Sequence, residues 1–213
     1  MQLYHYFRSS ASWRVRIALA LKHLDCDLVP VHLLRQEQWS EAYGALTPSH
    51  LVPVLKDDEA LLSQSMAIIE YLDECHPEPP LLPGTPLDRA RIRSLAQDMA
   101  CEIHPLDNLR VLRFLTQELA LGEEDKNRWY RHWVETGLAV VEQRLRDDPR
   151  TGRFCHGDAP TLADCVLVPQ VANGQRFDCR LDHVPTVMRI FDACMALDAF
   201  AGTQPSAYPE DAA

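Results

Sequence analysis

The sequence of 213 residues has none of the features that mark a membrane or secreted protein. No run reaches the roughly eighteen uncharged apolar residues that a membrane-spanning helix needs. The N-terminus, MQLYHYFRSS, places polar and basic residues where a secretory signal carries its apolar stretch. Hydrophobic residues make up 46% of the chain, enough to bury a substantial core. We therefore expect a cytoplasmic globular protein of one or two domains, with no membrane partner.

The chain also lacks an excess of positive charge and the cysteine spacing that is typical of metal sites. The formal net charge is −10 and no block of consecutive basic residues offsets it, which argues against a nucleic-acid partner. Any anionic ligand must be held by a few local groups. The seven cysteines include no CxxC pair and no zinc-type His/Cys spacing, so we expect free thiols in a reducing compartment and no metal site.

The first eighty or so residues alternate short strand-like and helical runs in the order βαβαββα, whereas the remainder has an almost entirely helical pattern. This order predicts a short mixed sheet with helices on its faces. The expected strands are Gln2–Tyr6, Asp27–Leu33, Val54–Lys56 and Ala60–Leu62, and the expected helices are Trp13–Lys22, Gln38–Ala45 and Gln64–Glu74.

A proline-rich stretch from His76 to Pro86 cannot continue a helix and predicts a stiff linker. We therefore place one domain at residues 1–82 and an all-helical domain at 87–213. The first long helix of the second domain should kink at Pro105. Further helices are expected over Asp125–Arg146, Thr161–Ala172 and Val184–Leu197.

The segment from Arg8 to Arg14, RSSASWR, stands between the first strand and the first helix. Its hydroxyls and backbone N–H groups would face an anion or a thiolate at that helix N-terminus. Serines in this position are more often plain N-caps, so the spacing alone favours the cap.

Two further motifs allow a structural and a functional interpretation. Pro53 opens a strand after a loop; a cis bond before it would turn the backbone of Val52 toward an extended ligand, although a trans edge proline is the commoner case. Gln64 and Ser65 open a helix and offer an amide, a hydroxyl and free N–H groups to a carboxylate, or simply cap the helix.

Other polar residues have a structural interpretation by default. Thr161 and Asp164 match a capping box directly before an apolar run. Arg110 and Arg176 are isolated arginines, which are usually solvated surface residues. His104 would more often be a capped or core histidine than a catalytic one.

Together these motifs resemble the zeta class of the cytosolic glutathione transferases. The segment Ser9–Leu19, SSASWRVRIAL, is similar to the class signature S-S-C-x-W-R-V-R-I-A-L. The resemblance implies a thioredoxin-like α/β N-terminal domain plus an all-α C-terminal domain, a homodimer, and maleylacetoacetate isomerase activity in tyrosine and phenylalanine catabolism. Further similar segments cover nearly the whole chain: Leu51–Pro53, Gln64–Leu72, His104–Leu106, Gly157–Asp164 and Leu167–Asn173.

The resemblance also implies glutathione as the cofactor and assigns residue roles. A thiolate that adds to a cis double bond lets it rotate, and its elimination then releases the trans product. Ser9, with Ser10 beside it, and Arg8 would be catalytic, and Arg8, Arg110 and Arg176 would bind the dianionic maleyl substrate. The implied glutathione site comprises Ser9, Ser10, Ala11, His50, Val52, Pro53, Gln64, Ser65, His104 and Asn108.

The chain departs from the class signature at one position, where Ala11 replaces the cysteine. Relatives that isomerise maleylpyruvate in gentisate catabolism also lack that cysteine, which keeps this substrate as an alternative. A zeta-type transferase acting on α-haloacids and a glutathione-transferase-like binding module without catalysis are the other hypotheses.

Overall fold

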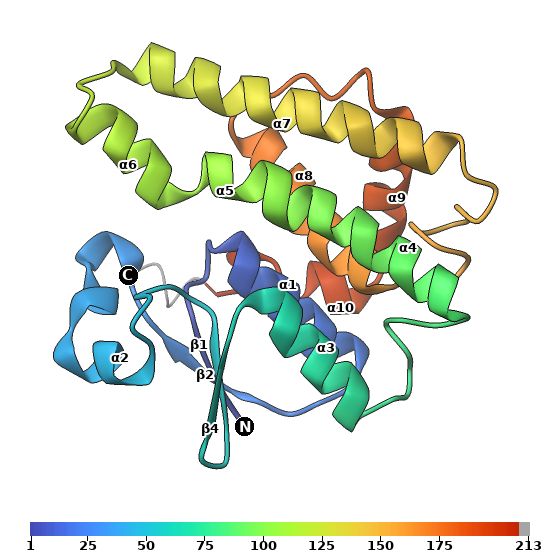
Figure 1. Cartoon of the computed structure of the whole chain (residues 1–213), viewed down its shortest axis with the longest axis horizontal. Coiled ribbons are helices and arrows are strands. Elements are labelled where there is room, and N and C mark those ends of the chain that lie inside the picture. The colour runs from blue at the N-terminus through green and yellow to red at the C-terminus, as the bar shows by residue number, and fades with distance from the viewer. Residues whose placement is uncertain (209–213) are drawn as a thin grey trace. The chain divides into compact units, whose positions relative to one another are not determined.

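The computed structural model of the chain describes residues 1–208, which divide into two compact units. The first unit comprises residues 1–81 and 196–208, and the second comprises residues 82–195. Among the described residues, the strands all lie in the first unit and the second is helical (Figure 1). This arrangement confirms the predicted fold class.

The first unit is built on a mixed four-stranded sheet in the order β2-β1-β3-β4. Strand β1 pairs in parallel with β2 and antiparallel with β3, and β3 and β4 form a hairpin. This is the sheet that the alternating sequence pattern predicts, although β2 ends three residues earlier than expected. The bounds are β1 Gln2–His5, β2 Asp27–Pro30, β3 Val54–Asp57 and β4 Ala60–Ser63.

Helices lie on both faces of this sheet. Helix α1 (Ser10–Leu21) packs against α3 (Ser65–Cys75), and α1 begins three residues before the predicted start because Ser9 caps it. The opposite face carries Tyr43 of α2, which clusters with Val54 of the sheet. The remaining helical segments here are η1 Leu33–Arg35, η2 Glu37–Trp39 and α2 Glu41–Leu46.

The end of the described chain returns to the first unit, where α10 (Asp198–Ala201) packs on α1 and the short η4 (Pro205–Ala207) follows. The indole of Trp13 donates to Thr203 Oγ1 at 3.1 Å, and Arg16 Nε donates to the Thr203 carbonyl at 3.1 Å. The sequence pattern predicts this segment as part of the helical domain, but its hydrogen bonds with buried donors of α1 place it in the first unit. Residues 209–213 of that predicted domain lie outside the described residues.

The second unit replaces the predicted kinked helix by several shorter ones. A π-helical segment precedes His104 and Pro105, where the proline has no N–H for the helical ladder. The chain then leaves helical geometry at Asn108 (φ −66°, ψ 145°). The elements are α4 Pro86–Gln97, π-helix η3 Asp98–Ile103, α5 His104–Asp107, α6 Leu109–Gln117, α7 Glu123–Arg146, α8 Leu162–Arg176 and α9 Pro185–Met195.

A close approach holds α7 against η3. A Cβ added at Gly137 would lie 2.4 Å from the side chain of Ile103, so only glycine fits at this point of α7. Ile103 immediately precedes His104, so this close contact lies directly before the start of α5.

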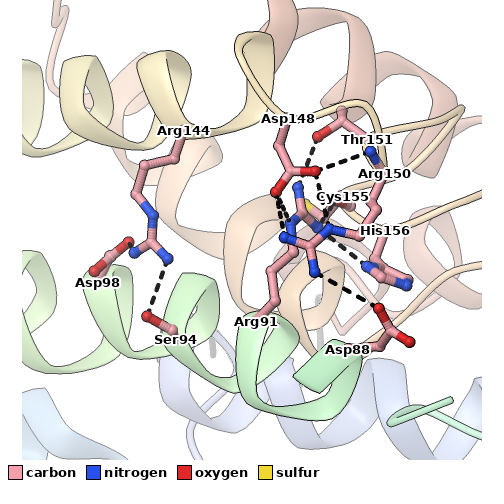
Figure 2. A network of polar contacts seen from close by, with 10 residues as sticks. All are labelled: Asp88, Arg91, Ser94, Asp98, Arg144, Asp148, Arg150, Thr151, Cys155 and His156. Carbon is pink, nitrogen blue, oxygen red and sulfur yellow. Dashed lines mark hydrogen bonds and ion pairs between the residues drawn. The ribbon is translucent and has the colours of Figure 1, made fainter. Parts of the chain in front are cut away.

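A polar network ties the loop after α7 to α4 (Figure 2). The buried Arg91 donates to Asp148 Oδ2 at 2.7 Å, to the Cys155 carbonyl at 2.8 Å and to Thr151 Oγ1 at 2.8 Å. Because arginine is only a donor, three acceptors from one loop satisfy it. The loop is therefore fixed where it leads into α8.

The predicted capping box at the start of α8 is formed. Both Thr161 and Asp164 are fully buried, and Asp164 Oδ2 accepts from the Thr161 N–H at 2.8 Å. Asp164 Oδ1 also accepts from the Cys155 N–H at 2.8 Å, so the carboxylate joins the loop to the helix. Within residues 1–208, no helix is long and apolar enough to cross a membrane, and no group of three His, Cys, Asp or Glu side chains could hold a metal ion.

Candidate functional site

The turn between β1 and α1 presents Ser9 at the start of the helix. Ser9 Oγ accepts from the Ser12 N–H at 3.2 Å, which confirms the N-cap. The cap uses an oxygen lone pair of the hydroxyl, so its proton remains a donor. Ser9 is half-buried whereas Ser10 is only 5% exposed, and Arg8 is exposed, with its guanidinium 5.0 Å from the Phe7 ring centre.

The peptide bond between Val52 and Pro53, in the loop before β3, is cis, which is the functional one of the two interpretations of Pro53. Strand pairing of β3 begins at Val54, so the main chain of Val52 lies outside the ladder. Tyr43 Oη donates to the Leu51 carbonyl at 2.7 Å and anchors the loop; burial raises the pKa of this hydroxyl, which stays protonated.

His50 occupies the left-handed region in the same loop (φ 54°). Its Nδ1 lies 2.8 Å from the Gln38 carbonyl, and its ring lies 4.4 Å from that of Trp39. A carbonyl only accepts, so Nδ1 carries a proton and Nε2 is left to face other groups. Gly44 leaves room for the ring, since an added Cβ there would lie 3.1 Å from His50 Cε1.

The start of α3 combines main-chain donors with a buried cation. Gln64 precedes the helix at φ 72° and makes no side-chain cap. Ser65 Oγ lies 3.3 Å from Nη1 of Arg14, a side chain that is only 2% exposed. Because arginine must be the donor in this contact, the Ser65 hydroxyl can still donate a hydrogen bond to a ligand. The helix N-terminus and the guanidinium together favour a carboxylate here.

Arg14 was missed by the sequence analysis as a site residue. The available signal was its place in the apolar run WRVRIAL, where Arg14 and Arg16 are two residues apart and both are 2% exposed. Charged side chains this deeply buried need defined partners.

In the second unit, three of the expected residues meet where α5 leads into α6. Asn108 Nδ2 lies 3.4 Å from His104 Nε2, and Asn108 Oδ1 accepts from the Arg110 N–H at 3.1 Å. His104 Nδ1 is 3.6 Å from Oδ1 of Asp107. The Arg110 side chain is exposed, as expected for an isolated arginine.

Arg176 lies in the last turn of α8 because this helix continues four residues beyond its predicted end. Its side chain is exposed, and its guanidinium is 4.8 Å from the Phe177 ring centre. The first unit therefore groups the expected glutathione residues at the starts of α1 and α3 and in the Val52 loop. The second unit groups His104, Asn108 and Arg110, with Arg176 on a separate helix.

Comparisons with known proteins agree with this arrangement of elements. Residues 3–80 match the family model "Glutathione S-transferase, N-terminal domain", and residues 127–173 match "Glutathione S-transferase, C-terminal domain". The chain belongs to the glutathione transferase family.

Relatives that match nearly the full length of the chain identify its class within the family. A probable maleylacetoacetate isomerase of Vibrio cholerae is 46% identical over 98% of this chain and 97% of its own length. A structure described as holo maleylpyruvate isomerase, a bacterial glutathione S-transferase in the zeta class, has a TM-score of 0.96 at 42% identity, covering 99% of each chain. The maleylacetoacetate isomerase of Methylobacterium extorquens, solved with malonate and glutathione, has a TM-score of 0.93 at 40% identity, covering 96% of each chain. Within its family, the chain is thus a zeta-class member, which confirms the resemblance.

Proposed function

We propose that this protein is a glutathione-dependent cis–trans isomerase that converts maleylacetoacetate to fumarylacetoacetate in tyrosine and phenylalanine catabolism. The observation that carries the proposal is full-length similarity to a relative named for this activity, on a shared fold. The donors of both units support it, since they suit a tripeptide thiol and a dicarboxylate.

The chemistry of the first unit's donor set fits glutathione. The γ-glutamyl carboxylate is assigned to Gln64, Ser65 and the start of α3, above the buried Arg14. The main chain of Val52 is assigned to the cysteinyl amide, because it lies outside the strand ladder. His50 is assigned to the other carboxylate of glutathione.

When bound, glutathione supplies a thiolate that adds reversibly to the maleyl double bond and so permits rotation. The Ser9 hydroxyl donates a hydrogen bond to the sulfur and, with the positive end of α1, favours the thiolate over the thiol. Ser10, only 5% exposed, is the neighbouring residue and the alternative donor. Arg8, next to Ser9 in the chain, stabilises negative charge that develops on the substrate carbonyl.

The substrate is a dianion, whereas the protein is acidic overall, so local cations must bind it. Arg110 and Arg176 are exposed arginines whose forks suit carboxylates. His104 and Asn108, which the class resemblance places in the glutathione site, lie beside Arg110 in the second unit and are assigned here to positioning it. No metal is assigned any role.

Maleylpyruvate is the second candidate substrate, favoured by the TM-score of 0.96 to the zeta-class maleylpyruvate isomerase. Ala11 stands where the class signature has cysteine, which bears on rate and substrate preference more than on the reaction. Turnover of maleylacetoacetate and maleylpyruvate, compared at equal concentration, identifies the preferred substrate.

The decisive measurement is the stoichiometry of glutathione. We expect a catalytic amount of glutathione to convert an excess of the maleyl substrate completely. Conversion that stops after one equivalent, together with faster release of halide from an α-haloacid, would favour the transferase. Failure to bind glutathione would favour a binding module.

We also propose a cytoplasmic homodimer. Sedimentation of the purified chain tests the assembly, since a monomer at micromolar concentration would contradict it. Fractionation of cells that express the chain tests the location.

A further inference from the structure

A buried carboxylate, Asp107, lies at the end of α5 with its side chain 1% exposed. Gln170 Nε2, from α8, donates to Asp107 Oδ2 at 2.9 Å, and the hydroxyl of Tyr130, from α7, lies close enough to interact electrostatically with the same carboxylate. His104 Nδ1 lies 3.6 Å from Oδ1. A carboxylate this deeply buried is stable only with such partners, so groups from three helices converge on it.

One chain of contacts leads from Asp107 to Arg110. The carboxylate faces His104 Nδ1 and favours a proton on that nitrogen, which leaves Nε2 as an acceptor for Asn108 Nδ2 at 3.4 Å. The amide of Asn108 is then oriented with Oδ1 toward the Arg110 N–H, where it caps α6. The orientation of His104 thus sets the start of α6 and the position from which Arg110 extends.

A second chain of contacts leads from Asp107 to Arg176. The Tyr130 ring stacks on Phe177 with centres 3.8 Å apart and planes at 20°. The guanidinium of Arg176 lies over the other member of this stack, 4.8 Å from the Phe177 ring centre. Tyr130, whose hydroxyl interacts with Asp107, therefore connects the carboxylate to the ring that Arg176 lies over.

Gln170 donates to Asp107 although, within residues 1–208, the acceptor of its own amide is left unsatisfied. The residue is fully buried, and among the described residues its Oε1 has no hydrogen-bond partner. An orphaned buried acceptor destabilises the fold, and an apolar side chain of similar size would avoid it. What the amide contributes is the donor to Asp107.

We propose that Asp107 is a positioning residue that orients Arg110 through His104 and Asn108, and Arg176 through Tyr130 and Phe177, for binding the two carboxylates of the substrate. This inference rests on the proposed function, because it takes these arginines as the substrate-binding groups. It predicts a defect in substrate affinity that is separate from glutathione affinity and from thermal stability.

The test compares Asp107→Asn and Tyr130→Phe with Glu142→Gln as the matched control. Glu142 is a buried carboxylate of α7 in the same unit, and it accepts from the Val187 N–H at 2.9 Å, away from both chains of contacts. Tyr130→Phe removes only the hydroxyl and keeps the aromatic stack, so it remains informative should Asp107→Asn fail to fold.

We expect Asp107→Asn to raise the KM for the maleyl substrate and the Kd of maleate roughly tenfold or more. Tyr130→Phe should raise both by a smaller factor, with the KM for glutathione within about twofold of wild type in each variant. Glu142→Gln should lower the melting temperature without moving either constant. Equal effects of Asp107→Asn and Glu142→Gln on maleate binding, or none, would overturn the proposal.

Maleate titration separates this inference from the proposed function. If the wild type bound maleate but did not isomerise maleyl substrates, the proposed function would be wrong, and the Kd of maleate in the variants would still decide the role of Asp107. A wild type that bound no maleate at all would overturn both.

Discussion

The two units hold their ligand-binding groups in different ways. In the first unit, the donors are the N–H groups at the starts of α1 and α3, which the backbone fixes, and the short hydroxyl side chains of Ser9 and Ser65. In the second unit, Arg110 and Arg176 are long exposed side chains that depend on contacts beneath them. Backbone-fixed donors lose little entropy on binding, whereas arginines lose more. Substitutions in the first unit should therefore change the chemistry, and those in the second should change substrate affinity.

The largest effect is expected for Ser9→Ala, which tests the chemical half of this comparison. Removal of the donor to the thiolate should lower kcat by about 10²–10³-fold, with a much smaller loss of glutathione binding. Ultraviolet titration of bound glutathione should show a raised thiol pKa.

Ser40→Ala controls for the lost cap, and Ser10→Ala tests which serine acts on the thiol. Ser40 caps α2 as Ser9 caps α1, since its Oγ accepts from the Tyr43 N–H at 3.2 Å. Ser40→Ala should therefore lower stability by a similar amount and leave the thiol pKa unchanged. If Ser10→Ala raised that pKa and Ser9→Ala did not, the roles assigned to the two serines would be reversed.

The next effect concerns the stability of the first unit as a function of pH. Burial, and then the charge of Arg16, lower the pKa of His5 from 6.5 to about 4. Between these values the unfolded chain binds more protons than the folded one, so stability is full above pH 6.5 and falls as the pH drops toward 4. The whole change is on the order of 3 kcal/mol.

Urea unfolding at several pH values checks this expectation. His5→Gln keeps an acceptor for Arg16 Nη1, which lies 3.1 Å from His5 Nδ1, and should flatten the profile. His132→Gln, at an exposed site on α7, should leave it unchanged. An unaltered slope in His5→Gln would show that other groups cause the acid sensitivity.

Arg176→Ala and Arg110→Ala test the affinity half of the comparison. Each should raise the KM for a maleyl substrate about 10- to 100-fold, because a charge-assisted contact to a carboxylate contributes roughly 1.5–3 kcal/mol. Glutathione affinity should stay nearly constant. Arg8→Ala should lower turnover as well, since Arg8 lies beside Ser9. If Arg176→Ala and Arg110→Ala both kept wild-type kinetics, these arginines would be ordinary solvated surface residues. The haloacid transferase would then be the better hypothesis.

Local sequence signals predicted the features that depend on residues close together in the chain. The strands and helices of the first unit and the Thr161 capping box each depend on residues within a few positions. The missed contacts join distant positions: Arg14 to Ser65, Asp107 to Gln170, and Trp13 to Thr203. No spacing in a single sequence shows which buried donor meets which acceptor, so the support beneath the site emerged only from the fold.

The smallest effect is expected at the two helix starts of the second unit, where a buried capping box can be compared with an exposed one. Thr161→Ala removes the Oγ1 donor to Asp164 Oδ2, 2.8 Å away in a fully buried site, and should cost on the order of 1 kcal/mol. Thr85 makes the equivalent bond to Asp88 at 2.7 Å in an exposed site, where water replaces a lost partner, so Thr85→Ala should cost about half as much. The difference between the two variants, measured by urea unfolding, gives the contribution of burial to this motif. Equal losses would show that burial adds nothing, and unchanged stability in Thr161→Ala would show that the hydroxyl does not support α8.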